Sequence, residues 1–176
     1  MAARLRPLRP EDAVALLAFR TANRGFLRPW EPVRDESFYT VEAAAAAIEA
    51  QQAERAADRG YAFGIFAPEG LVGYVNLNAV VRGVFQNAYL GYAVAEAANG
   101  RGHATQAVRE ATRIGFEELG LHRVQAAVIP RNAGSVRVLE KAGFRREGFA
   151  ERYLLINGTW EDHILFAVTC DEYRCR

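Results

Sequence analysis

A glycine-rich hexapeptide is the segment whose residue types and spacing could do chemistry. It is followed by Thr105 and by a run with helical periodicity, and it consists of Asn99-Gly100-Arg101-Gly102-His103-Ala104. A helix N-terminus presents unpaired backbone N–H groups and the positive end of the helix dipole, and both attract phosphate. Glycine lets an anion approach the backbone closely, and Arg101 and His103 can add charge or donors at the rim. The segment therefore predicts a phosphate-binding loop.

Other phosphate-binding motifs fit this segment less well. A P-loop ends in Gly-Lys-Ser or Gly-Lys-Thr, which is absent here. A dinucleotide fingerprint needs a third glycine where Thr105 stands, and an acidic residue at the end of the next strand, which here ends at Ile129-Pro130. A Gly-x-Gly pattern alone is equally well explained as a tight turn before a helix.

The elements that must position this loop follow from hydrophobic periodicity and from turn residues. Asn157-Gly158 is a strong hairpin signal, and Gly25, Gly60, Gly120 and Gly143 follow helical stretches as stops. The predicted helices are 12–24, 40–59, 102–119 and 132–142, and the predicted strands are 4–7, 61–67, 71–78, 87–94, 121–129, 144–156 and 159–168. Residues 26–37 are expected to be irregular. This order predicts an α+β fold with one largely antiparallel sheet, in a single domain over residues 1–176.

Composition excludes several classes of function. The chain has 176 residues and a formal charge of +1, so it offers no basic surface for nucleic acid. No apolar run reaches the roughly 20 residues of a membrane span, and the first residues lack the apolar region of a signal peptide. Cys170 and Cys175 match no redox or zinc motif, and the three histidines, His163 among them, lack ligand spacing. We expect a cytoplasmic protein with no metal and no membrane partner.

The sequence resembles the GNAT superfamily of N-acetyltransferases. Their signature, Gln/Arg-x-x-Gly-x-Gly/Ala, opens a long helix after an antiparallel strand, and here Asn99 stands where the family has Gln or Arg. The segments 119–128 and 130–144 look like the second half of the family's domain. The segments 145–148 and 156–163, together with Arg28-Pro29-Trp30, are similar to the ribosomal-protein N-acetyltransferase branch, of the RimJ and RimL kind.

This resemblance implies a fold and a cosubstrate. The family's sheet has splayed middle strands flanked by helices, and acetyl-CoA lies in the gap with its pantetheine arm along one strand. That strand corresponds to Tyr89–Val94, with Ala93 and Val94 as backbone contacts. The pyrophosphate corresponds to residues 99–105. Asn132 corresponds to a pantetheine contact as well as a helix N-cap. Lys141 is predicted to contact a phosphate, although a solvated helix face explains it equally well.

The resemblance also implies roles for hydroxyl groups and aromatic rings. Ser135 would serve the leaving thiolate, because the family's tyrosine acid four residues later is Leu139 here. Tyr92 lies on a central strand and could direct a hydroxyl into the cleft. The acceptor pocket is predicted to include Trp30, Tyr39 and Tyr74, although core packing explains these rings equally well.

The predicted reaction is direct attack of an amine on the thioester, without a covalent enzyme intermediate. At pH 7, deprotonating a lysine amine costs about 4.6 kcal/mol, whereas an α-amine costs about 1.4 kcal/mol. The sequence shows no compelling carboxylate base, which favours a protein N-terminus or a small amine as the acceptor, and the resemblance to the ribosomal-protein branch favours the protein N-terminus. The alternatives are a small-molecule amine acetyltransferase, a non-catalytic CoA-binding module and a nicotinamide-dependent oxidoreductase. Either a monomer or a homodimer is compatible with the sequence.

Overall fold

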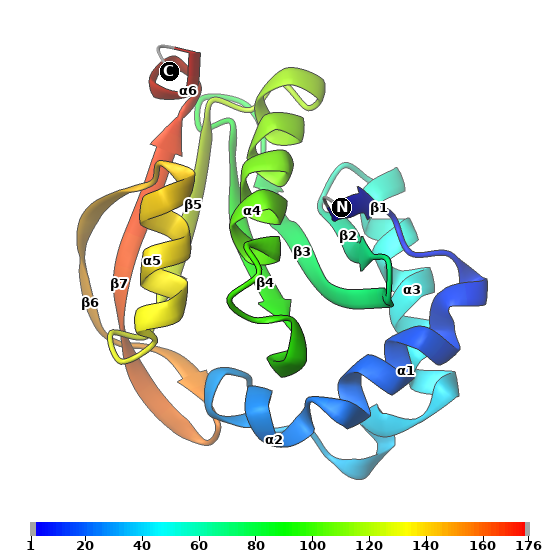
Figure 1. Ribbon diagram of the computed structural model, residues 1–176. Coiled ribbons are helices and arrows are strands. Elements are labelled where there is room, and N and C mark those ends of the chain that lie inside the picture. The colour runs from blue at the N-terminus through cyan, green and yellow to red at the C-terminus, as the bar shows by residue number, and fades with distance from the viewer. Residues whose placement is uncertain (1–2, 175–176) are drawn as a thin grey trace.

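The alternating segments of the sequence pair into one mixed sheet. The computed structural model describes residues 3–174, and over that range the sheet has seven strands in the order β1-β2-β3-β4-β5-β7-β6 (Figure 1). Every neighbouring pair is antiparallel except β4 and β5. The strands are β1 Arg4–Arg6, β2 Tyr61–Ala67, β3 Gly70–Val81, β4 Asn87–Val94, β5 Arg123–Val128, β6 Arg145–Ile156 and β7 Thr159–Thr169.

The parallel contact between β4 and β5 is short. Its register covers Asn87 with Arg123, Ala88 with Val124 and Tyr89 with Gln125, and no later residues of the two strands pair. Beyond Tyr89 the strands diverge, which opens a gap in the middle of the sheet (Figure 1). The predicted α+β fold with splayed middle strands is confirmed.

Helices cover both faces of the sheet. The α-helices of the described chain are α1 Ala13–Ala22, α2 Arg24–Leu27, α3 Val41–Ala56, α4 His103–Arg113, α5 Ala133–Ala142 and α6 Cys170–Arg174. As predicted, Thr40 caps α3, and its Oγ1 accepts a hydrogen bond of 3.1 Å from the N–H of Ala43. None of the helices within residues 3–174 is long and apolar enough to cross a membrane.

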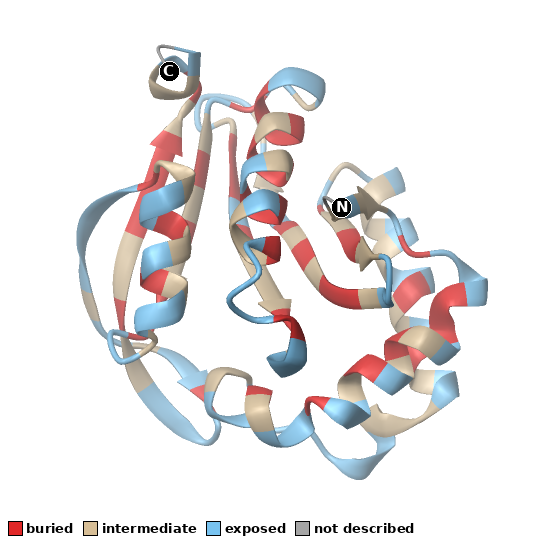
Figure 2. Ribbon diagram, in the orientation of Figure 1, coloured by how far each residue is buried: buried red, intermediate tan, exposed pale blue. Residues whose placement is uncertain are grey.

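Two apolar clusters hold these layers together. The larger one joins α4 and α5 to the sheet and includes the fully buried side chains of Val108 and Leu139. The smaller one joins α1 and α3 to the opposite face, around Ala44 and Ile48. Figure 2 shows buried positions recurring along the inner side of α4 and along the middle strands, as expected for amphipathic elements packed on a sheet.

Some element boundaries differ from the prediction. Gly25 lies inside α2 and does not end a helix; α1 ends at Asn23, whose side-chain Nδ2 donates to the carbonyl of Phe19 (2.8 Å). The helix predicted over 102–119 is α-helical only to Arg113 and then π-helical over Ile114–Glu118. The segment expected to be irregular contains α2 and short 3-10 turns, and α6 was not predicted.

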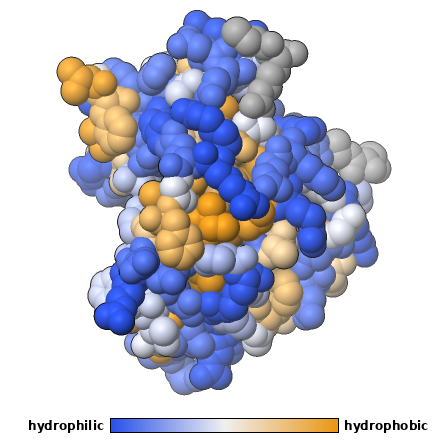
Figure 3. All heavy atoms as spheres, turned by 90° about the vertical axis from the view of Figure 1, so that its left-hand side faces the viewer, coloured by the Kyte–Doolittle hydropathy of each residue, from blue (hydrophilic) through white to orange (hydrophobic). Residues whose placement is uncertain are grey.

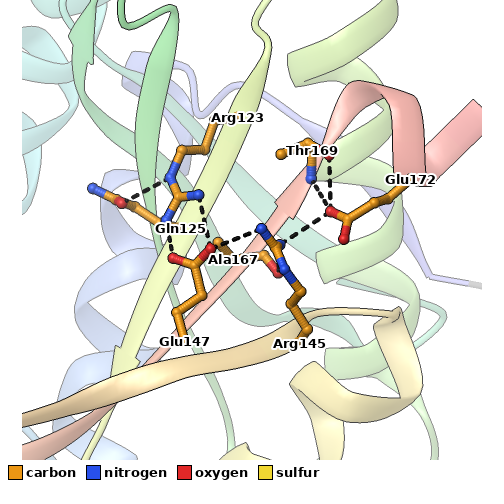
Figure 4. Close-up of polar contacts among 7 residues, drawn as sticks. All are labelled: Arg123, Gln125, Arg145, Glu147, Ala167, Thr169 and Glu172. Atoms are coloured by element: carbon orange, nitrogen blue, oxygen red, sulfur yellow. Dashed lines mark hydrogen bonds and ion pairs between the residues drawn. The ribbon is translucent and has the colours of Figure 1, made fainter.

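Charged side chains connect the C-terminal strands to one another. The Arg123 guanidinium pairs with Glu147, which also accepts from Arg145 at 2.8 Å (Figure 4). Arg145 reaches the Glu172 carboxylate on α6 at 3.1 Å, and that carboxylate accepts from the backbone N–H of Thr169 at 2.8 Å. The network thus ties β5, β6, β7 and α6 together on one side of the gap.

The β6–β7 hairpin carries several exposed apolar side chains. Figure 3 shows apolar surface among polar residues on this side of the molecule. The large exposed apolar residues of β6 and β7 are Phe149, Leu154, Leu155 and Trp160. Of the two cysteines near the C-terminus, Cys170 is buried and Cys175 lies outside the described residues.

One glycine controls how closely β3 approaches β4. A Cβ added to Gly73 would lie 2.3 Å from the carbonyl oxygen of Ala93, far inside van der Waals contact. By comparison, a Cβ on Gly91 would meet nothing closer than 3.9 Å. The backbones of β3 and β4 therefore come close together at the C-terminal end of β4, where β4 no longer pairs with β5.

Candidate active site

A cleft of about 710 Å³ opens where β4 and β5 separate. Its walls come from the loop before α4, the first turns of α5, the facing residues of β3, β4 and β5, and the segment around Trp30. The β6–β7 hairpin closes one end, because the backbone N–H of Asn157 donates to the carbonyl of Glu31 at 2.9 Å. Segments from both halves of the chain thus converge on one space.

The predicted phosphate loop forms the α4 end of this cleft. Gly100 and Gly102 have φ angles of 75° and 82°, the left-handed region that favours glycine, and Gly102 is the N-cap of α4. No side chain caps this helix, and the space beside both glycines is open to 4 Å. An uncapped helix N-terminus facing open space can receive a phosphate group.

The side chains predicted to support the loop divide into two groups. The cleft is lined by Asn99, Gly100, Gly102, His103, Ala104, Thr105 and Lys141. Arg101 does not line it; its guanidinium instead pairs with Glu69 at 2.9 Å, in the turn between β2 and β3. Lys141 is thus the lysine available to a phosphate in the cleft. Arg101 could contact such a phosphate only from outside the cleft.

Only alternate backbone groups of β4 point into the gap. The N–H of Ala95 donates to the carbonyl of Val72 on β3 (2.8 Å), so the backbone of Ala95 points toward β3. Because backbone groups alternate along a strand, those of Ala93 also point toward β3, while those of Val94 point toward the gap. Of the two predicted backbone contacts, Val94 is the one placed to pair with an extended ligand as an added strand would.

Two hydroxyl groups meet across the gap. The Tyr92 hydroxyl lies 2.7 Å from Ser135 Oγ and also donates to the carbonyl of Ser135 at 3.1 Å. Burial raises the pKa of Tyr92 to about 12, so the phenol stays protonated at neutral pH. Asn132 is the N-cap predicted for α5, and its Oδ1 accepts from the N–H of Ser135 at 3.0 Å. The structure therefore brings together both predicted catalytic side chains.

The opposite face of the sheet presents a different set of groups. Tyr74 and Asn76 alternate on β3 and pair with Ala93 and Gly91, so all four lie on the face away from Tyr92. The Tyr74 hydroxyl donates to Glu31 Oε1 at 2.7 Å, and burial, together with the nearby carboxylate, raises its pKa. Asn76 Oδ1 is buried and has no hydrogen-bond partner among the described residues.

A buried histidine completes this face of the cleft. His163 on β7 is 3% exposed, lines the cleft and packs its ring edgewise against Tyr153 at 5.6 Å. Its Nδ1 lies 2.9 Å from the carbonyl oxygen of Glu161. A carbonyl only accepts, so Nδ1 carries the proton, and in the neutral ring Nε2 keeps a free lone pair.

Different functional groups therefore line the cleft on the two faces of the sheet. Hydroxyl groups and the helix N-terminus lie on the α4 and α5 side, and Glu31, Asn76 and His163 lie on the other side or at its end. Trp30 and Tyr74 line the cleft as predicted, whereas Tyr39 lines a smaller adjoining cavity. Among the residues described, no three His, Cys, Asp or Glu side chains cluster as a metal site would require.

Sequence reasoning missed Glu31 and Asn76. Alternation along β3 places Asn76 two residues after Tyr74, so period-2 counting could have found it. Nothing in the sequence signals that Glu31 reaches Tyr74, because the two residues are separated by 43 positions and Glu31 lies outside any regular element.

Comparisons with known proteins agree with this geometry. A family profile described as an acetyltransferase (GNAT) domain matches residues 3–145. The probable N-acetyltransferase YjcK of Bacillus subtilis is 43% identical over 93% of this chain and 92% of its own length. The [ribosomal protein uS5]-alanine N-acetyltransferase of Escherichia coli is 36% identical over 96% and 88%. Mycobacterium smegmatis RimJ, solved in complex with CoA-disulfide, superposes with a TM-score of 0.91 at 37% identity over 96% and 82%.

The glycine loop provides a first test. We expect Gly102→Ala to cost about 1 kcal/mol of stability, because φ is positive there, and to weaken coenzyme A binding roughly tenfold. Gly83→Ala is the matched control, since Gly83 also has a positive φ of 70° and open surroundings but does not line the cleft. Calorimetric titration should show wild-type affinity for coenzyme A in the control. Wild-type affinity in Gly102→Ala as well would place the phosphates elsewhere.

The hydroxyl pair provides a second test. Ser135→Ala should lower kcat and kcat/KM together by about 100-fold, because it removes the donor nearest the gap. Tyr92→Phe removes the partner hydroxyl at nearly constant volume and should lower kcat about tenfold while leaving the coenzyme KM unchanged. Steady-state kinetics at saturating coenzyme measure both values, and a normal kcat in Ser135→Ala would remove the pair from the chemistry.

Proposed function

The chain belongs to the GNAT acetyltransferase family and is an acetyl-CoA-dependent N-acetyltransferase, and we propose that its acceptor is the N-terminal α-amine of a protein. We also propose that residues 1–176 form one catalytic domain. The observation that carries the proposal is the cleft itself, which reaches from the helix N-terminus on one face of the sheet to the Tyr74–Glu31 pair on the other. The cytoplasmic location stays a prediction.

The residues of the cleft fit coenzyme A at three points. Gly100 and Gly102 would receive the pyrophosphate at the start of α4, with Asn99 and Lys141 beside it. Val94 would pair with the pantetheine arm, and Asn132 would contact the same arm. Bound there, the coenzyme supplies an activated acetyl thioester. The acceptor would enter from the opposite face, past Trp30 and Tyr74.

The relatives and the energetics of deprotonation support an α-amine acceptor. The E. coli relative is named for an alanine of ribosomal protein uS5. An α-amine also needs about 3 kcal/mol less deprotonation at pH 7 than a lysine amine does. A single neutral imidazole is sufficient for an α-amine, whereas a lysine amine would need a stronger base.

His163 would take the proton in this mechanism. Its ring lines the cleft and its Nδ1 is held by the Glu161 carbonyl, so Nε2 is the nitrogen left to accept. As the C–N bond forms and the C–S bond breaks, the amine proton passes to Nε2. Ser135, in contact with Tyr92, donates a hydrogen bond that stabilises the departing thiolate. The charged groups around His163 are Glu161 and Asp162 on its own strand and Arg131, which pairs with Glu161 at 2.6 Å.

A pair of peptides tests the acceptor. One carries a free N-terminus and acetylated lysines, and the other carries a blocked N-terminus and a free lysine. With labelled acetyl-CoA, mass spectrometry should find the label on the α-amine of the first peptide and little on the second. Labelling confined to lysine would refute the proposal. Turnover of a small amine alone would assign the enzyme to small-molecule acetylation, and coenzyme binding without any thiol release would indicate a non-catalytic module.

A histidine substitution tests the proton acceptor. We expect His163→Gln to lower kcat/KM roughly 100-fold, because the amide cannot take a proton. His122→Gln is the control, since His122 is exposed and does not line the cleft. Coenzyme affinity should be unchanged in both variants. A normal kcat/KM in His163→Gln would assign the proton to another group.

A further inference from the structure

A second cavity adjoins the active-site cleft on the acceptor side. Its volume is about 170 Å³, and it lies between α1, the turn around Phe38 and β3. It shares Glu31, Arg34 and Tyr74 with the larger cleft, so the two spaces meet at the Tyr74–Glu31 hydrogen bond. A chain leaving the cleft on the acceptor side can therefore extend into it.

Arg20 forms one wall of this cavity without a carboxylate partner. Its guanidinium lies 4.0 Å from the centroid of the Phe38 ring and donates one long hydrogen bond, of 3.3 Å, to the carbonyl of Phe38. No carboxylate among the described residues lies within ion-pair distance of it. Burial lowers the pKa of Arg20 and the positive charge of Arg34 lowers it further, whereas the Glu31 carboxylate acts in the opposite direction. The side chain is thus a partly desolvated cation with most of its donors unused.

Arg34 adds a second positive charge to the same cavity. It lies 4.6 Å from the centroid of the same Phe38 ring, and it too has no ion pair with any described residue. The nearest carboxylate in the cavity wall, Glu31, accepts the Tyr74 hydroxyl. Arg24 also lines the cavity but is neutralised by Glu36 at 3.0 Å. The cavity therefore holds a surplus of positive charge beside the acceptor path.

We propose that Arg20 and Arg34 bind a carboxylate of the acceptor, so that the enzyme prefers N-termini with Asp or Glu among the first few residues after the reactive amine. This inference rests on the proposed function, since it concerns the side chains of the same acceptor. The Tyr74 residue that borders both spaces pairs with Ala93 on β4, directly beside the strand edge that faces the gap. An amine at the gap would thus leave the next residues of the acceptor near the two guanidinium groups, whose forked donors match a carboxylate.

The test compares acceptor peptides that differ by one charge. Glu and Gln are placed in turn at the second, third and fourth positions of an otherwise neutral peptide with a free N-terminal alanine. For wild type at low salt we expect roughly tenfold higher kcat/KM for Glu at one of these positions. Arg20→Gln and Arg34→Gln should each reduce the ratio of kcat/KM for the Glu peptide to that for the Gln peptide, and the double variant should bring this ratio near unity.

Arg55→Gln is the matched control. Arg55 also stacks on aromatic rings, 4.8 Å from the Phe63 centroid, and burial lowers its pKa as well, but it lines neither cavity. It should keep the full preference for Glu. Thermal melting checks that each variant is folded, and the exposed position of Arg34 makes its variant informative even if Arg20→Gln is destabilised.

Binding of the products separates this inference from the proposed function. Calorimetry with N-acetylated Glu and Gln peptides, in the presence of coenzyme A, requires no turnover. Tighter binding of the Glu peptide to wild type, lost in the double arginine variant, supports the subsite even if the reactive amine is not an α-amine. Equal rates or equal affinities for the Glu and Gln peptides in wild type would overturn the inference, and they would leave acetylation of N-termini intact.

Discussion

β4 and β5 pair at only three positions, and the arrangement of the active site depends on that short contact. A fully paired sheet would be a closed wall between α4 and α5 on one side and α1 and α3 on the other. Where the pairing stops, the two faces communicate, and the hydroxyl pair of Tyr92 and Ser135 on one face comes within reach of Tyr74 on the other. The large apolar cluster beneath α4 and the ion-pair network of β5, β6 and β7 hold the two halves of the sheet on either side of this opening.

Much of the fold could be predicted from local signals in the sequence. The helix start at residue 102 could be predicted because Gly100 and Gly102 precede a helical run, and their positive φ angles explain why glycine is present. The Asn157-Gly158 hairpin and the Thr40 cap have equally local causes. The π-helical turn at Ile114–Glu118 could not be predicted, because its residues have ordinary helical periodicity. Within it, Gly115 lies against Val124 of β5.

The candidate active site also has one part that could be predicted from the sequence and one part that could not. The part of the cleft formed by the glycine loop and the start of α5 could be predicted, because the loop and the following helix form one continuous motif, and Ser135 lies close to Asn132 on another helix. The acceptor side depends on pairs of residues from distant segments, such as Glu31 with Tyr74. Tyr39 was predicted in the acceptor pocket, but its side chain lines the smaller cavity next to the main cleft. Its position depends on the path of the chain around α2, which the sequence does not indicate.

The close approach at Gly73 has a consequence for how this sequence can change over time. Any side chain at this position must displace the carbonyl of Ala93, which a Cβ would meet at 2.3 Å, and that carbonyl belongs to the strand bordering the gap. Most core positions tolerate drift among apolar residues of similar volume, because neighbouring side chains can repack. Here the obstacle is backbone, so substitutions would be purged even though Gly73 has no side chain, and this pair of strands should change more slowly than the walls of the two cavities beside it.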